Sequence, residues 1–214
     1  MRGWDRQTML VVACGSLLLF RLGVPAEAGE PTDKVRETVN AVMDVLADEA
    51  LKAPERTAER RAKIRQAVLQ RFGFEEMAQR SMGQHWRKRT PQEQKEFVAL
   101  FSDLLERSYI DKIESYGGGK QNIRYAKETI DKDGYASVRS EITSERGQVY
   151  EIEYRLLQRD DNWQVYDIVI EGVSLVNNYR TQFNKVILEQ SYEQLVKQMK
   201  LKQEQEKAAT GSKG

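Results

Sequence analysis

Apolar and charged residues alternate from Tyr150 to Leu156, and this is the clearest pattern in the chain. A period of two residues is that of a β-strand with one buried face and one solvated face. A sheet with one apolar face needs other elements packed on that face. We expect the buried face to consist of Tyr150, Ile152, Tyr154 and Leu156, and the solvated face of Glu151, Glu153 and Arg155.

Four strands are predicted for the second half of the chain. They are separated by turn residues, with Gly134 and Gly147 at two of the turns, which is typical of β-hairpins. Short turns between consecutive strands indicate an antiparallel meander. The predicted strands are Gln121–Ile130, Tyr135–Thr143, Val149–Gln158 and Trp163–Glu171.

The inward face of the fourth strand depends on the length of the turn before it, because a shift of one residue exchanges the two faces. A two-residue turn at Asp161 and Asn162 would place Val165, Asp167 and Val169 inside. A three-residue turn from Asp160 would place Tyr166, Ile168 and Ile170 inside. We favour the second arrangement, since it sets Arg155 opposite Asp167 on the outside and keeps the larger apolar side chains within.

Apolar residues recur at steps of three and four upstream of the strands, which is the period of amphipathic helices. A first helix, with Thr32 as its N-cap, extends to the break at Pro54, and a second covers Glu55–Phe72. A short amphipathic piece holds Met77 and Met82 and ends at Gly83.

A long helix begins at Thr90, because a Thr cap, Pro91 at the first helical position and Glu93 three residues after the cap form a strong start signal. It ends at Gly117–Gly119. Its apolar stripe consists of Phe97, Phe101, Leu104, Leu105, Tyr109 and Ile113.

A last helix is predicted from Val173 to Met199, and Lys200–Gly214 is a polar tail that we expect to fray. Helices followed by a strand meander indicate an α+β fold, with helices packed on one face of a four-stranded antiparallel sheet.

The N-terminal segment has the layout of a secretory signal peptide. Arg2 and Arg6 precede an uncharged run, Met9–Phe20, which is too short to span a bilayer. An A-x-A site places cleavage after Ala28. Residues 29–199 would then form one exported domain.

Composition excludes several classes of function for that domain. The whole chain of 214 residues has a net charge of +1, so no basic field argues for nucleic acid. Residues 29–214 carry no net charge and contain no cysteine, which excludes disulfides, thiolate catalysis and Cys-ligated zinc.

Residues that could perform chemistry are few. His85 is the only histidine and stands beside Trp86, so we interpret it as structural. Asp167 lies within an apolar strand, either as a buried carboxylate or as an outward partner of Arg155. The chain shows no phosphate loop, nucleophile elbow or metal-ligand spacing, and therefore gives no positive sign of an enzyme, a cofactor or a metal site.

Two segments resemble a known family. Residues 163–183, WQVYDIVIEGVSLVNNYRTQF, and residues 74–86, FEEMAQRSMGQHW, resemble the signatures of the MlaC family of periplasmic phospholipid-binding proteins, also called toluene-tolerance proteins. The resemblance covers nearly all of residues 29–199. It implies an NTF2-like fold with a lipid cavity between sheet and helices. It also implies shuttling of phospholipid between an inner-membrane MCE/ABC transporter complex and an outer-membrane lipoprotein complex, which maintains the lipid asymmetry of the outer membrane.

The apolar side chains that would line such a cavity come from the helices and from the inward strand positions. Two other functions stay open: an NTF2-like enzyme on an apolar substrate with Asp167 as base, and an assembly protein whose core is full. The lipid could also be another kind, such as a hopanoid. The expected lipid-binding residues are Trp86, Phe97, Phe101, Leu104, Tyr109, Tyr150, Ile152, Tyr154, Ile168, Ile170, Val173 and Tyr179.

Overall fold

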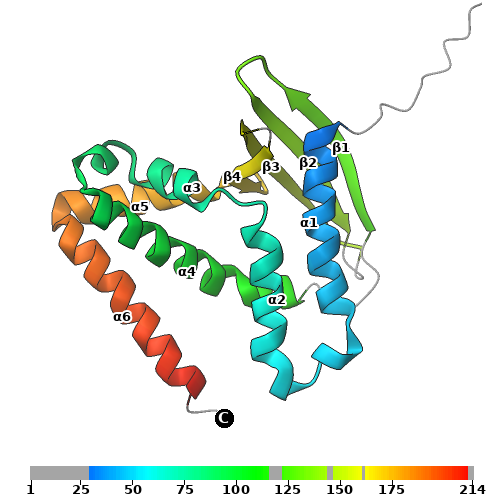
Figure 1. The fold of residues 1–214 in the computed structure, drawn as a ribbon, viewed down its shortest axis with the longest axis horizontal. Coiled ribbons are helices and arrows are strands. Elements are labelled where there is room, and N and C mark those ends of the chain that lie inside the picture. The colour runs from blue at the N-terminus through cyan, green and yellow to red at the C-terminus, as the bar shows by residue number, and fades with distance from the viewer. Residues whose placement is uncertain (1–28, 116–121, 144–146, 161, 212–214) are drawn as a thin grey trace, which may run out of the picture.

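The computed structural model describes residues 29–115, 122–143, 147–160 and 162–211, and contains one antiparallel sheet with helices beside it (Figure 1). The expected signal peptide and the Gly117–Gly119 stop lie outside the described residues. The strands follow the order of the sequence across the sheet: β1 Asn122–Ile130, β2 Tyr135–Thr143, β3 Val149–Arg159, β4 Asn162–Ile170 and β5 Val173–Ser174.

The four predicted strands are confirmed, and the sheet has a fifth, very short one. A tight turn at Glu171 and Gly172, both with positive φ (49° and 78°), leads from β4 into β5. Two consecutive residues with positive φ are typical of a two-residue hairpin turn, and glycine adopts this conformation without strain. The expected direct passage from β4 into a helix is therefore wrong.

A β-bulge in β4 decides which residues face inward. Arg155 pairs with Asp167, but the next residue, Leu156, pairs with Val165, so Tyr166 is the extra residue. We call the sheet face that carries Tyr154 and Leu156 the inner face, and the opposite one the outer face.

The bulge gives β4 a pattern that neither turn length predicts. The pairing of Arg155 with Asp167 is confirmed, and Ile168 and Ile170 face inward opposite Tyr154 and Ile152. The inward placement of Tyr166 is wrong, because its ring packs against Tyr135 on the outer face. Trp163 and Val165 occupy the inner face instead and are buried in its core.

The first helix is interrupted before Pro54. α1 Glu30–Ala47 is followed by the 3-10 turns Glu49–Leu51 and Pro54–Arg56, and then by α2 Thr57–Leu69. Thr32 is not the N-cap: α1 begins two residues earlier, and the Thr32 amide and hydroxyl donate to Glu128 Oε2 of β1 at 2.8 and 2.6 Å. These bonds attach the start of α1 to the edge of the sheet.

The long central helix begins as predicted. α3 Phe74–Met82 leads into a 3-10 segment, η3 Gly83–Lys88, and α4 covers Pro91–Ser115. The capping box is present, since the Glu93 amide donates to Thr90 Oγ1 at 3.3 Å and the Thr90 amide donates to Glu93 Oε2 at 2.7 Å.

The C-terminal helix is two helices, not one. α5 Leu175–Glu189 ends at Gln190, and α6 Tyr192–Gly211 begins after Ser191, whose hydroxyl accepts from the Gln194 amide at 3.2 Å. α6 continues through the start of the expected polar tail at Lys200.

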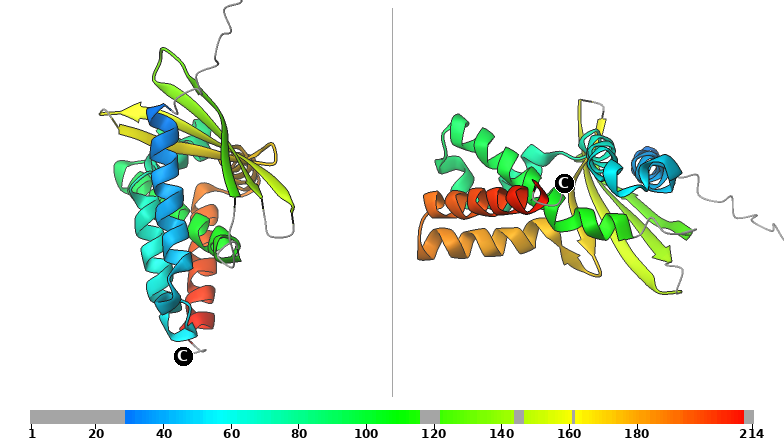
Figure 2. Two further views of the ribbon diagram at one scale, coloured as in Figure 1. Left: turned by 90° about the vertical axis from the view of Figure 1, so that its right-hand side faces the viewer. Right: turned by 90° about the horizontal axis from the view of Figure 1, so that it is seen from below.

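The helices form two groups relative to the sheet. α1 runs along the inner face beside α2, whereas α5 and α6 lie side by side and extend away from the sheet (Figure 2). Three apolar clusters follow from this arrangement: one between α1 and the inner face, one among α1, α2 and α4, and the largest among α3, α4, α5 and α6.

Candidate functional site

The inner face of the sheet is the first candidate site, and α1 covers part of it. Val35 of α1 packs on Val138, Tyr154 and Leu156, all of them buried. The chain before α3 pairs with the edge of β4, because the Val165 amide donates to the carbonyl of Arg71 and the Gly73 amide donates to the carbonyl of Val165, both at 2.9 Å, and Phe72 packs against the same core.

Beyond this covered part, the inner face continues as an apolar strip. Ile152 and Ile168 are half-buried at its margin. Cross-strand pairing places Ile123, Ile142 and Tyr150 on the same face, and Ile170 opposite Ile152. Val173, paired with Ile170, has 57% of its surface exposed at the end of the strip. We call Ile123, Ile142, Tyr150, Ile152, Ile168, Ile170 and Val173 the apolar strip.

The structure brings half of the predicted lipid-binding residues together here. Five belong to the apolar strip, and Tyr154 lies next to it beneath α1. Ile123 and Ile142 also belong to the strip but were not among the predicted residues. The signal was present in the first two strands, where apolar residues also alternate, but the faces of those strands were not assigned.

The other six predicted residues lie in the large helical cluster. Trp86, Phe97, Phe101 and Tyr179 are buried in it, and Leu104 and Tyr109 are packed against it. The rings are in contact: Phe101 meets Tyr179 at 5.4 Å and Phe183 at 5.8 Å between centroids, both edge to face. This group is a dense aromatic core, separate from the apolar strip.

Two tyrosine hydroxyls are buried on the inner face. Burial raises the pKa of Tyr154 far above its ordinary value, and the neighbouring Tyr125 adds to the rise. Burial also raises the pKa of Tyr125, against a smaller opposing effect of Arg36, whose guanidinium lies 5.0 Å from the centre of its ring. The Tyr125 hydroxyl has no hydrogen-bond partner among the described residues.

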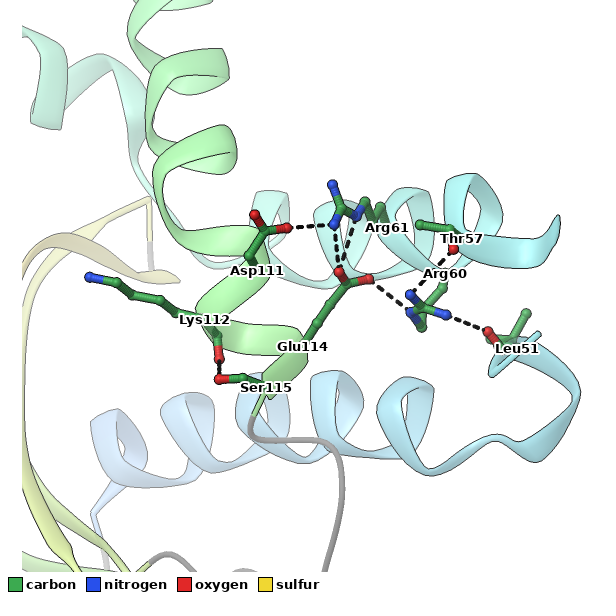
Figure 3. Close-up of polar contacts among 8 residues, drawn as sticks. All are labelled: Leu51, Thr57, Arg60, Arg61, Asp111, Lys112, Glu114 and Ser115. Carbon is green, nitrogen blue, oxygen red and sulfur yellow. Dashed lines mark hydrogen bonds and ion pairs between the residues drawn. The ribbon is translucent and has the colours of Figure 1, made fainter. Parts of the chain in front are cut away.

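The end of α4 is held against α2 by an ion-pair cluster (Figure 3). Glu114 accepts from Arg60 Nε at 2.8 Å and from Arg61 Nη2 at 2.7 Å. Arg61 also reaches Asp111, and Arg60 Nη1 donates to the carbonyl of Leu51 at 2.7 Å. Burial raises the pKa of Glu114, but the bonds from Arg61 and Arg60 outweigh it and hold the pKa below its ordinary value. The cluster therefore fixes α2 against the end of α4.

The two candidate chemical groups of the sequence both have structural partners. Asp167 is 3% exposed and accepts from Ser174 Oγ at 2.6 Å, the Val176 amide at 3.0 Å and Arg155 Nη1 at 3.2 Å. Both features considered for Asp167 are present, since it pairs with Arg155 on the outer face and is also buried, because the start of α5 covers it. His85 is buried, with Nε2 2.8 Å from Asn184 Oδ1. No group of three metal-ligating side chains occurs in the part of the chain that the structure describes.

Comparison with known proteins identifies the family. The family described as MlaC protein matches residues 36–201 of this chain. The chain belongs to the MlaC family. A curated relative from Haemophilus influenzae, the intermembrane phospholipid transport system binding protein MlaC, is 22% identical over 139 residues, which cover 64% of each chain.

Other relatives agree with this assignment. The toluene tolerance protein ttg2D of Pseudomonas putida is 28% identical over 97 residues, covering 45% of this chain and 44% of that protein. The aligned part thus spans less than two thirds of either curated relative. A solved structure of a phospholipid-binding protein from Ralstonia solanacearum, in complex with a phospholipid, superposes with a TM-score of 0.72 at 25% identity. The superposition covers 83% of this chain and 98% of that one. The fold of this chain is NTF2-like, as the resemblance implied.

The two signature segments of this chain meet in space. Residues 163–183 run through β4, the tight turn, β5 and α5, so the motif forms the junction between the sheet and the helical group. Its Asp167 holds three of these parts together through Ser174 and Val176. Residues 74–86 form α3 and the start of η3, which pack on α5.

Proposed function

We propose that this protein is a periplasmic lipid carrier that moves phospholipid between the inner and outer membranes. The observation that carries the proposal is the apolar strip on the inner face, where Val173 is largely exposed and every isoleucine except the buried Ile142 is partly exposed. An apolar surface left open on one side of a sheet is typical of a ligand-binding or partner-binding face.

The physical need for such a surface follows from the hydrophobic effect. Transfer of one CH₂ group from water to an apolar site is favourable by about 0.8 kcal/mol. For an acyl chain of ~16 carbons the total free energy is on the order of 12 kcal/mol. A carrier that crosses an aqueous compartment must cover that chain, while the charged head group can stay in water. The absence of net charge in residues 29–214 favours release, because no general attraction holds the protein on an anionic membrane.

The acyl chains are proposed to lie on the apolar strip, against Tyr150, Ile152, Ile168, Ile170 and Val173. The six predicted residues of the helical cluster form the alternative contact set. They are less favourable as a lining, since Phe97 and Phe101 are already fully buried against other rings. The names of the relatives from Haemophilus influenzae and Ralstonia solanacearum support phospholipid as the ligand.

Export and partners belong to the same proposal. Cleavage after Ala28 would release the domain into the periplasm with Gly29 as its first residue. Within the described residues, no helix is both long and apolar enough to cross a membrane. The partners would be an inner-membrane MCE/ABC transporter complex and an outer-membrane lipoprotein complex, between which the lipid is passed.

A carrier needs no catalytic group, and the enzyme alternative is disfavoured by the geometry of Asp167. A general base must have a lone pair directed at the substrate. The Asp167 carboxylate already accepts from a hydroxyl, a backbone amide and a guanidinium.

The test compares two substitutions that introduce the same charge on opposite faces of β3. Ile152→Glu puts a carboxylate on the apolar strip, where an unpaired charge among acyl chains costs several kcal/mol. Val149→Glu is the matched control, because Val149 is 50% exposed and lies three residues away on the outer face. Each protein is recovered from the periplasm, and its bound lipid is measured by native mass spectrometry before and after organic extraction.

We expect Ile152→Glu to carry little lipid, and Val149→Glu to carry as much as the unchanged protein. Equal lipid content in both, with circular dichroism showing both folded, would exclude the apolar strip as the lipid site. The mass of the extracted lipid separates phospholipid from another lipid such as a hopanoid. An unchanged protein that never carries lipid would support an assembly protein with a full core.

A further inference from the structure

A second hollow lies on the outer face, away from the apolar strip. β4, α3, η3 and the start of α5 enclose an open groove of about 800 Å³. Arg155 and Asp167 from the strands form one wall, and consecutive strand residues alternate between faces, so this wall is opposite to Tyr154 and Ile168. Four arginines line the groove: Arg80, Arg87, Arg155 and Arg180.

Two of these arginines are engaged within the protein. Arg80 Nε donates to Glu76 Oε1 at 2.7 Å, and its guanidinium lies 4.1 Å from the centre of the Tyr166 ring. Arg155 pairs with Glu153 at 3.1 Å and with Asp167 at 3.2 Å.

The other two are exposed and have no carboxylate partner among the described residues. Arg87 comes from η3 and Arg180 from α5, and both side chains border the groove. Asp167 is the one carboxylate among the described residues that line it, and its oxygens are already occupied. The groove therefore has a positive excess within a chain of nearly balanced charge.

The Arg180 guanidinium lies close to the backbone at the end of α3. Gly83 has a φ of +52°, and a Cβ built on it would lie 2.9 Å from Arg180 Nε. The guanidinium therefore occupies the space that a side chain at position 83 would need. It also lies beside the C-terminal end of α3, where the helix dipole favours a cation.

We propose that this groove is a docking site for an acidic peptide segment of a protein partner. Arginine forks bind carboxylates with good geometry, and Gln79, Gln84 and Asn177 offer side-chain amides for a peptide backbone. A lipid is a poor occupant, because the lining is mainly polar and the apolar strip lies on the other face. The inference adds a partner site to the proposed carrier, and both sites can be filled at once.

The experiment uses the protein of residues 29–214 and a short blocked poly-glutamate peptide as the probe. Binding is measured by calorimetry and by tryptophan fluorescence, in which Trp86 lines the groove and Trp163 lies on the inner face. The double variant Arg87→Glu/Arg180→Glu should weaken binding by about tenfold or more, since two attractive contacts become repulsive. Arg87→Gln/Arg180→Gln, which only removes charge, should weaken it less.

The control is Lys127→Glu/Lys132→Glu, which makes the same change in net charge at exposed positions of β1 and the turn after it. Peptide binding that survives in the arginine double variant, or that falls equally in the lysine variant, overturns the proposal. Inorganic phosphate or anionic phosphatidylglycerol vesicles that bind as well as the peptide, and lose binding in the arginine variant, also overturn it. Lipid content is measured in every variant and should be unchanged, so a failure of this inference is separate from a failure of the lipid site.

Discussion

At the residue scale, Asp167 shows how far a local pattern can specify an environment. A charged residue in an apolar strand is either buried with partners or directed to water, and the sequence left both possibilities open. The structure combines them: Asp167 faces Arg155 on the outer face and is nevertheless buried, because Ser174 and the Val176 amide fold over it. The start of α5 can cover Asp167 because the two-residue turn after β4 reverses the chain. The alternation of residues within β4 does not predict this turn.

Tyr125 provides a prediction about the inner face. Its hydroxyl is buried without a hydrogen-bond partner among the described residues. Removal of the hydroxyl therefore breaks no hydrogen bond, and it relieves the cost of burying an unpaired polar group. We expect Tyr125→Phe to leave the free energy of unfolding unchanged or to raise it by up to about 1 kcal/mol. Urea denaturation of lipid-free protein measures the change.

The matched control is Tyr192→Phe, which removes the bond from the Tyr192 hydroxyl to the Glu93 carbonyl at 3.2 Å. This variant should lose about 1 kcal/mol. A similar loss in Tyr125→Phe would mean that the Tyr125 hydroxyl does form a hydrogen bond, and the account of this part of the inner face would be incorrect.

At the element scale, the sequence predicts which elements exist better than where they are interrupted. The capping box at Thr90 and the strand alternation depend on nearby residues, and both are confirmed. The break between α5 and α6 contains no Pro or Gly. It is favoured by Ser191 as a cap and by packing of Tyr192 on Phe97, which a local pattern does not report. The bulge at Tyr166 likewise depends on the pairing of two strands, so the inward face of β4 could be predicted only in part.

The ion pairs between α2 and α4 give a prediction at the same scale. Glu114→Gln should lower the free energy of unfolding by about 1 to 2 kcal/mol near neutral pH, because two guanidinium groups lose a charged, partly buried acceptor. The pKa of Glu114 is held below its ordinary value in the folded protein. Its stabilising effect is therefore present above the ordinary glutamate pKa of about 4.3 and is lost as the pH falls through the folded value.

Denaturation curves at a series of pH values check both statements. The difference between Glu114→Gln and the unchanged protein should narrow in acid. Glu59→Gln is the control, since Glu59 of α2 forms only exposed, local pairs, with Arg56 in the turn before α2 and with Lys63 in α2, and should cost at most about 0.5 kcal/mol. Equal losses in the two variants would show that the α2–α4 contact depends on packing alone.

At the scale of the whole molecule, the apolar residues divide between two regions with different roles. The sequence predicted apolar residues for a lipid site, but it could not separate strand positions from helix positions in space. The fold places the strip beyond the cover of α1, and the aromatic core of α3–α6 at the β4 side of the sheet. Six of the predicted residues thus serve a core that holds the helices together.

Hydrogen exchange can decide which region holds the lipid. Binding protects the segments that it covers, because a bound ligand lowers the population of local openings. Comparing lipid-loaded with lipid-extracted protein, we expect slower exchange after loading in β3 and in the segment from Ile168 to Ser174. The segments around Phe101 and Tyr179 should change little, since their rings are already packed in the lipid-free core. Protection that appears instead around Phe101 and Tyr179, with β3 unchanged, would place the acyl chains among the helices and contradict the assignment to the apolar strip.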